Sequence, residues 1–133
     1  MDNIELMEYW LKSAENDYEA MQVMFNSKKN TWTLFLGHLV IEKLLKGLYA
    51  KNNKENPHTI KSHNLLALAE KCNLELTDEQ VEKLQIITQF NISARYDDYK
   101  ESFYQKCTDE YTLEQVKNIE EVREWLKSLL TMK

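Results

Sequence analysis

Turn-forming residues are scarce in this sequence. Its 133 residues include only two glycines and one proline. A β-sheet needs many turns, and tight turns recruit these two residue types. Leucine, glutamate, lysine and alanine, which favour helices, fill the chain instead. A hydrophobic content of 43% with 29% charged residues is typical of a globular chain. The composition therefore predicts an all-α globular fold.

Cysteines, long apolar runs and excess positive charge are also lacking. Cys72 and Cys107 are too few for a disulfide scaffold, so we expect two reduced thiols. No apolar run approaches the roughly 18 residues of a membrane helix, and Asp2, Glu5 and Glu8 argue against a signal peptide, so we expect a cytoplasmic protein without a membrane partner. The net charge of −5 repels nucleic acid unless a local basic patch overrides it.

Apolar residues recur at steps of three and four along five stretches, which is the spacing of one helix face. The second stretch has an apolar face broad enough to predict a central helix that touches several neighbours. We expect one domain spanning residues 1–133, an up-and-down antiparallel bundle of four long helices and one short helix. The predicted helices begin at Asp2 or Asn3, near Thr31, near Ser62, at a capping box of Thr77 and Gln80, and at a second capping box of Thr112 and Gln115.

Residues 93–107, between the last two predicted long helices, combine charge with aromatic rings but lack an apolar stripe. Arg95 suits a bidentate grip on phosphate, and Lys100 adds a point charge. Tyr96 and Tyr99 offer rings on which bases can stack, whereas Asp97 would pair with Arg95 or repel a phosphate. In the alternative interpretation, Arg95 forms a salt bridge with an acid on another helix. The rings of Tyr96, Tyr99, Phe103 and Tyr104 would then hold a loop on the bundle.

His38, Glu42 and Lys46 follow one another at steps of four, so they share one face of the second predicted helix. One interpretation is a polar row that faces a cleft beside Arg95, where Lys43 and Lys46 meet a nucleotide phosphate. In the other interpretation, Glu42 and Lys46 form a surface pair worth a few tenths of a kcal/mol, and His38 is hydrogen-bonded at the edge of the core.

Other site chemistries find little support. His58 and His63 flank the loop before the short helix, but zinc would need two further ligands, so we expect them to cap a helix or pin the loop. The serines lack a nucleophile elbow, and Gly37 and Gly47 alone are too few for a phosphate-binding loop. We therefore expect no metal and no cofactor.

Four motifs in order resemble the HEPN domain family, named for higher eukaryotes and prokaryotes nucleotide-binding. The resemblance runs from about residue 8 to residue 130. Residues 9–17 read YWLKSAEND and residues 38–49 read HLVIEKLLKGLY. They are similar to the family patterns W-L-x-x-A-E-x-D and H-x-x-x-E-K-x-L-K-x-L. Residues 63–66 read HNLL and residues 94–97 read ARYD, similar to the patterns T-H-D-L and A-R-Y-P.

The resemblance implies an up-and-down helical bundle that commonly forms homodimers. It also implies an association with minimal nucleotidyltransferases, in toxin–antitoxin pairs or on one chain. Some branches are metal-independent RNases with an R-x(4–6)-H motif across the dimer interface. Here no histidine follows Arg95 in that window, although an imidazole is the side chain that carries a proton near neutral pH.

We therefore expect a homodimeric module that binds a nucleotide or RNA, docks a nucleotidyltransferase partner, or does both. The alternative is an RNase with a variant site, in which Arg95 binds phosphate and Tyr96, Tyr99 or Lys100 transfers protons. A third hypothesis is a pure interaction element.

Overall fold

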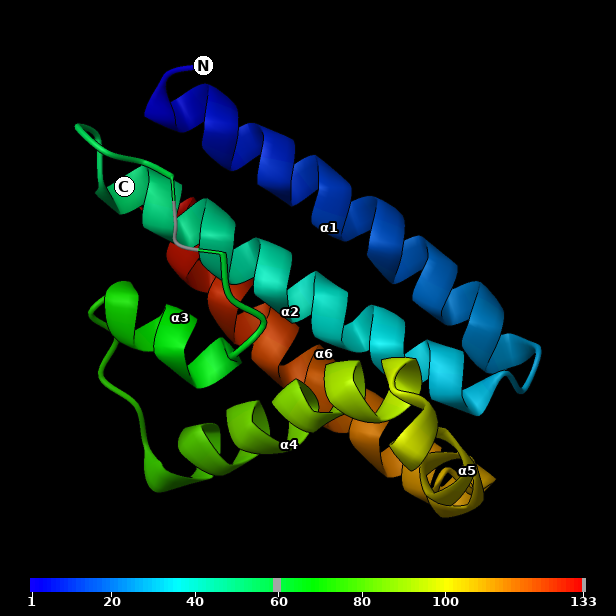
Figure 1. The fold of residues 1–133 in the computed structure, drawn as a ribbon. Coiled ribbons are helices and arrows are strands. Elements are labelled where there is room, and N and C mark those ends of the chain that lie inside the picture. The colour runs from blue at the N-terminus through cyan, green and yellow to red at the C-terminus, as the bar shows by residue number, and fades with distance from the viewer. Residues whose placement is uncertain (59–60, 133) are drawn as a thin grey trace.

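The fold is all-α, as the composition predicted. The computed structural model describes residues 1–58 and 61–132, and within them it contains six helices and no strand. Four of the helices are long and one is short, as predicted, but a sixth helix occupies the segment expected to be non-helical. The helices are α1 (Asn3–Asn26), α2 (Asn30–Asn52), α3 (Leu65–Lys71), α4 (Asp78–Arg95), α5 (Asp97–Lys106) and α6 (Asp109–Thr131) (Figure 1).

The helix starts follow capping chemistry, with two corrections to the predicted positions. Asp2 caps α1, and the Thr77 capping box begins α4 as predicted. The second predicted capping box is wrong, because Thr108 caps α6 and Thr112 lies buried inside that helix. Two acidic residues directly after Thr108 complement the helix dipole and favour the earlier start. The short α3 is capped by Asn64 rather than begun near Ser62.

Helix α2 is the centre of the fold, as its broad apolar face predicted. It contacts each of the other five helices. Leu34, Ile41 and Leu45 on α2 are fully buried, together with residues on opposite sides of the helix. Because α2 is covered on nearly all sides, polar residues on it are buried unless the neighbouring helices leave a gap.

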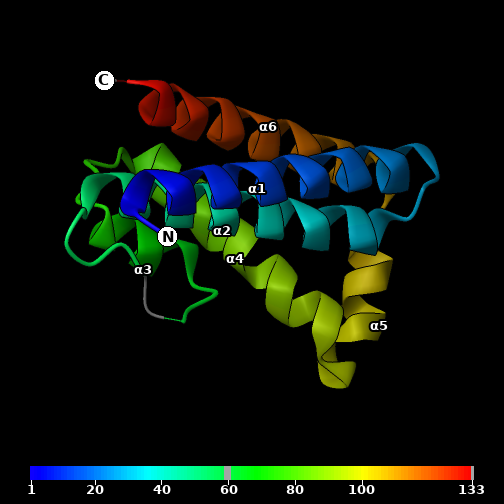
Figure 2. The same ribbon diagram turned by 90° about the horizontal axis from the view of Figure 1, so that it is seen from above.

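The arrangement departs from a regular antiparallel bundle. Helices α1 and α2 form an antiparallel hairpin, but α2 and α6 lie side by side and run in the same direction (Figure 1). At their starts, the Asn30 amide donates to the Asp109 carboxylate at 2.9 Å. At their ends, the Lys51 ammonium donates to the Leu129 carbonyl at 2.9 Å. Figure 2 shows that α4 diverges from the long axes of α1 and α2 and that α5 turns back from the end of α4 toward the start of α2.

Within the described residues, none of the helices combines the length and the apolar character needed to cross a membrane.

Candidate functional site

Arg95, the last residue of α4, is exposed at the surface. Its Nη1 donates to the Asn91 Oδ1, 3.4 Å away and one turn earlier on the same helix. Its guanidinium also lies 6.0 Å from the centre of the Tyr96 ring. In the described part of the chain, no carboxylate lies within ion-pair distance of Arg95. The alternative interpretation, a salt bridge to another helix, is therefore not what these residues form.

One aromatic ring attaches α5 to the rest of the fold. Phe103 is buried and lies 5.9 Å, centroid to centroid, from the Phe90 ring of α4. The other three rings of the segment, those of Tyr96, Tyr99 and Tyr104, are exposed. The predicted role of all four rings in holding the segment is therefore correct only for Phe103. The three tyrosines remain available to a ligand or a partner.

Two further predicted site residues, Asp97 and Lys100, pair with each other. Their side chains lie 3.3 Å apart on the first turn of α5, and both are exposed. Asp97 does not neutralise Arg95, because its ion-pair partner is Lys100. The positive charge of Arg95 is thus left without a compensating carboxylate among its described neighbours.

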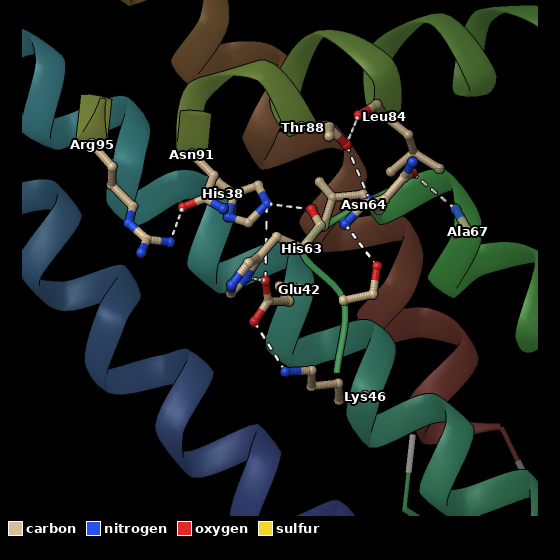
Figure 3. Close-up of polar contacts among 12 residues, drawn as sticks. His38, Glu42, Lys46, His63, Asn64, Ala67, Leu84, Thr88, Asn91 and Arg95 are labelled. Carbon is tan, nitrogen blue, oxygen red and sulfur yellow. Dashed lines mark hydrogen bonds and ion pairs between the residues drawn. The ribbon is translucent and has the colours of Figure 1, made fainter. Parts of the chain in front are cut away.

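Glu42 on α2 is the centre of a polar cluster that it forms with His38, Lys46 and His63 (Figure 3). Its side chain is only 5% exposed. One carboxylate oxygen lies 2.7 Å from the His63 Nδ1, and the other lies 3.1 Å from the Lys46 ammonium. The interpretation of Glu42 and Lys46 as a surface pair is therefore wrong, because the carboxylate is buried. A buried carboxylate without such partners would be strongly destabilising.

His38 is fully buried next to this carboxylate. Its Nε2 lies 2.9 Å from the His63 carbonyl oxygen. Because a carbonyl only accepts, that nitrogen carries the hydrogen. Burial lowers the pKa of His38, which keeps the ring neutral, so its Nδ1 carries a lone pair. That Nδ1 has no hydrogen-bond partner among the described residues. The interpretation of His38 as a hydrogen-bonded core histidine is therefore confirmed for one of its two nitrogens.

The two lysines predicted to meet a phosphate are held by α1. Lys43 lies 2.6 Å from the Asp17 carboxylate, with both side chains 21% exposed. Lys46 lies over the Trp10 ring at 5.1 Å in addition to its pair with Glu42. Figure 3 shows the His38 end of the predicted row next to Asn91, which contacts Arg95, whereas Lys46 lies at the far end of the row. Lys43 and Lys46 form ion pairs with carboxylates, whereas Arg95 has no carboxylate partner among the described residues.

Three surface hollows lie around α5. The first, of about 260 Å³, is lined by Trp32, Lys100 and Tyr104 among others. The second, of about 550 Å³, shares Trp32 and Tyr104 and extends to the turn before α2. The third, of about 300 Å³, includes Tyr99. In the ranges that the structure describes, no three metal-ligating side chains come together.

His63 contacts Glu42, and Asn91 contacts Arg95. Neither was among the predicted site residues. The sequence signal for Asn91 is an amide inside an apolar stretch of α4, one helical turn before Arg95. His63 was expected only to cap a helix or pin the loop, and its contact with Glu42 spans 21 positions of sequence. No pattern among neighbouring residues in the sequence indicates such a contact.

Comparison with models of known protein families identifies the family of the chain. The HEPN domain model matches residues 7–129. The chain belongs to the HEPN domain family. The match confirms the resemblance drawn from the four motifs, and it covers nearly the whole chain. Comparison with curated proteins gives no match, and comparison with solved structures gives none either.

A HEPN domain is a helical module of the nucleotide-binding or RNase-like kind. All three histidines of this HEPN domain precede Arg95 in the sequence. His63 nevertheless reaches the region of α4, because the backbone N–H of Leu65, two residues later, donates to the Thr88 hydroxyl at 3.1 Å. Figure 3 shows the His38 ring next to Asn91 of α4. The fold therefore supplies imidazoles near α4 although the usual motif lacks one.

Proposed function

We propose that this HEPN domain is a homodimeric module that binds a nucleotide or RNA through Arg95 and docks a nucleotidyltransferase partner in a toxin–antitoxin-like system. The observation that carries the ligand-binding part is the exposed guanidinium of Arg95, which contacts a neutral amide and no carboxylate among the described residues. A cation of this kind is a binding group for an anionic ligand.

The chemistry of the guanidinium fits a phosphate. Five N–H groups form a planar fork, and the single contact with Asn91 leaves most of them available. Two parallel N–H groups bind two phosphate oxygens at once, which gives a charge-assisted and oriented contact. The exposed Tyr96 ring beside the guanidinium offers a face on which a base can stack. Together they match the phosphate and the base of one nucleotide.

Calorimetric titration with nucleotides and short RNA tests this proposal. We expect the Arg95→Ala variant to bind at least about tenfold more weakly, because a charge-assisted hydrogen bond is worth about 1.5–3 kcal/mol. Arg95→Lys keeps the charge but loses the fork, so its affinity should fall between the two. Lys12→Ala, which removes an exposed cation on α1, is the control and should bind like the wild type. Equal binding by wild type and Arg95→Ala would remove the ligand part and leave only docking.

The docking part of the proposal is supported by exposed apolar side chains around the same site. Ile92, Tyr96 and Tyr99 are 38%, 55% and 53% exposed. Aromatic residues of this kind are enriched at protein interfaces. Co-purification with a minimal nucleotidyltransferase tests the partner. The complex should survive Arg95→Ala and be lost in Tyr99→Glu, whereas retention in both variants would place the interface elsewhere.

An RNase with a variant site is the second candidate, and it is favoured by the two imidazoles, His38 and His63, that lie near α4. Such an enzyme would cleave RNA without added metal, and Arg95→Ala would abolish the cleavage. Incubation of the wild type with labelled RNA in the presence of a chelator tests it, and RNA that stays intact would reject it.

A further inference from the structure

His63 has one ring nitrogen fixed and the other free. Its Nδ1 lies 2.7 Å from the buried Glu42 carboxylate. Since a carboxylate only accepts, Nδ1 is the donor. The His63 side chain is 56% exposed, and its Nε2 has no hydrogen-bond partner among the described residues. A buried carboxylate thus orients an imidazole whose second nitrogen faces outward, which is how carboxylates fix functional histidines.

The backbone beside this ring is held from two helices. His38 on α2 donates to the His63 carbonyl at 2.9 Å. The Asn64 side chain accepts from the Ala67 N–H and so caps α3. The Leu65 N–H donates to Thr88 on α4 at 3.1 Å. These contacts hold the backbone beside the ring, and the Glu42 contact orients the ring itself.

The segment that carries His63 contacts the same face of α4 that carries Arg95. Thr88, Asn91 and Arg95 are spaced by three and four residues, so they share one helix face. Long helical side chains point back toward the helix N-terminus, and the contact between Arg95 and Asn91 shows this direction. Figure 3 shows the Arg95 side chain reaching Asn91, and the His63 ring next to Glu42 and the His38 ring.

The outward nitrogen of His63 is an acceptor when its Nδ1 donates to Glu42 and the ring is neutral. The guanidinium of Arg95 is a donor, and its geometry suits a phosphate. In a ribonucleotide, the donors close to the phosphates are the ribose hydroxyls. A donor at Arg95 and an acceptor at His63, on a segment that contacts the face of α4 carrying Arg95, therefore complement a phosphate and a ribose hydroxyl of one ligand. The 2′-hydroxyl is the group by which proteins tell RNA from DNA.

We propose that His63 is a ligand-contacting residue that selects ribonucleotides over deoxyribonucleotides, its Nε2 accepting a hydrogen bond from the ribose 2′-hydroxyl while Arg95 binds the phosphate. Glu42 is the positioning residue of this pair. The inference rests on the proposed function, since it assigns the sugar contact of the same site.

The test compares the affinity for one short single-stranded RNA with that for the DNA of the same sequence, by fluorescence anisotropy of the full chain. We expect the wild type to prefer RNA by about threefold to tenfold, the worth of one hydrogen bond. His63→Asn keeps a side-chain N–H in the place of Nδ1, so the contact with Glu42 persists while Nε2 is lost. This variant should bind RNA and DNA with equal affinity and bind DNA like the wild type.

The control variants separate the two proposals. Arg95→Ala should weaken binding of RNA and DNA alike, because the phosphate is common to both. An unchanged RNA preference in His63→Asn, or an equal loss for both ligands, would overturn the role of His63 while a loss in Arg95→Ala still supports phosphate binding. No binding of either strand by the wild type would overturn both. If His63→Asn does not fold, His63→Ala serves, because it also removes Nε2 and the preference is a ratio measured within one variant.

Discussion

At the scale of the residue, the site is governed by the burial of polar groups on α2. Glu42 is accommodated in a covered position because Lys46 and His63 contact both carboxylate oxygens. His38 keeps its ring neutral beside them, because burial lowers its pKa. The row of His38, Glu42 and Lys46 is thus an internal support, whereas Arg95 and the His63 ring are exposed at the surface.

The neutral state of His38 predicts a pH dependence of stability. Its ordinary pKa is 6.5 and the folded value is lower, so the unfolded chain binds more protons as the pH falls below about 6.5. This contribution to stability is fully present above that pH and is lost on acidification. We expect the free energy of unfolding in urea to fall from pH 7.5 to pH 5, by at most about 1.4 kcal/mol per pH unit from this one group.

The control for this prediction is His38→Gln, whose amide N–H can still donate to the His63 carbonyl but does not titrate. The slope of stability against pH should be shallower in this variant. Identical slopes in both proteins would show that His38 does not control the acid loss.

At the scale of the element, one glycine sets the contact between α2 and α6. A Cβ at Gly37 would overlap the Ile119 Cδ1 and lie 3.2 Å from its Cγ1. The parallel neighbours therefore approach each other where α2 has no side chain. At Gly47, by contrast, a Cβ would lie 3.4 Å from the Trp10 Cβ, an ordinary contact. The two glycines differ in the space around them although both lie in the same helix.

These two positions predict opposite effects of the same substitution. Gly37→Ala should lower the free energy of unfolding by about 1–2 kcal/mol, since overpacking outweighs the gain in helix propensity. Gly47→Ala should be neutral or stabilising by up to about 1 kcal/mol. Ile119→Val removes the Cδ1, so it should rescue part of the Gly37→Ala loss in the double variant. Urea unfolding of the wild type and the four variants measures these effects. Equal effects at the two glycines would contradict this view of the contact.

At the scale of the whole molecule, exposed large apolar side chains gather on the face formed by α5, the end of α4 and the start of α2. Trp32 and Tyr104 are 51% and 70% exposed, and both line the two hollows on that side. Such a surface supports the proposal of a homodimer, because a second copy would cover it. The Arg95 site would then lie close to the interface, where a partner could narrow it.

A homodimer should have twice the chain mass of 15.9 kDa in light scattering at micromolar concentration. We expect Trp32→Glu combined with Tyr104→Glu to shift the mass to the monomer, because two charges would be buried at the interface. Val23→Glu, at a 61% exposed apolar position on α1, is the matched control and should remain dimeric. A wild type of monomer mass would contradict the dimer.

Local chemistry made much of the fold predictable. The apolar spacing and the caps lie within one helix each, so α1, α2 and α4 were placed correctly to within a residue or two at their starts. The sequence gives no helix signal for α5, because this helix buries a single large residue, Phe103, and therefore has no apolar stripe. The start of α6 was misread because Thr112 mimics a cap in the sequence, whereas the helix begins at Thr108.

The sequence by itself determined the helices, the central place of α2 and the family of the chain, because each depends on residues a few positions apart or on ordered motifs. Only the tertiary structure decided that α2 and α6 run parallel, that Glu42 is buried, and that His63 rather than a residue after Arg95 brings an imidazole to the site. These features join segments 21 to 79 positions apart. Contacts at such separations are set by how the helices pack, which no local pattern of residues encodes.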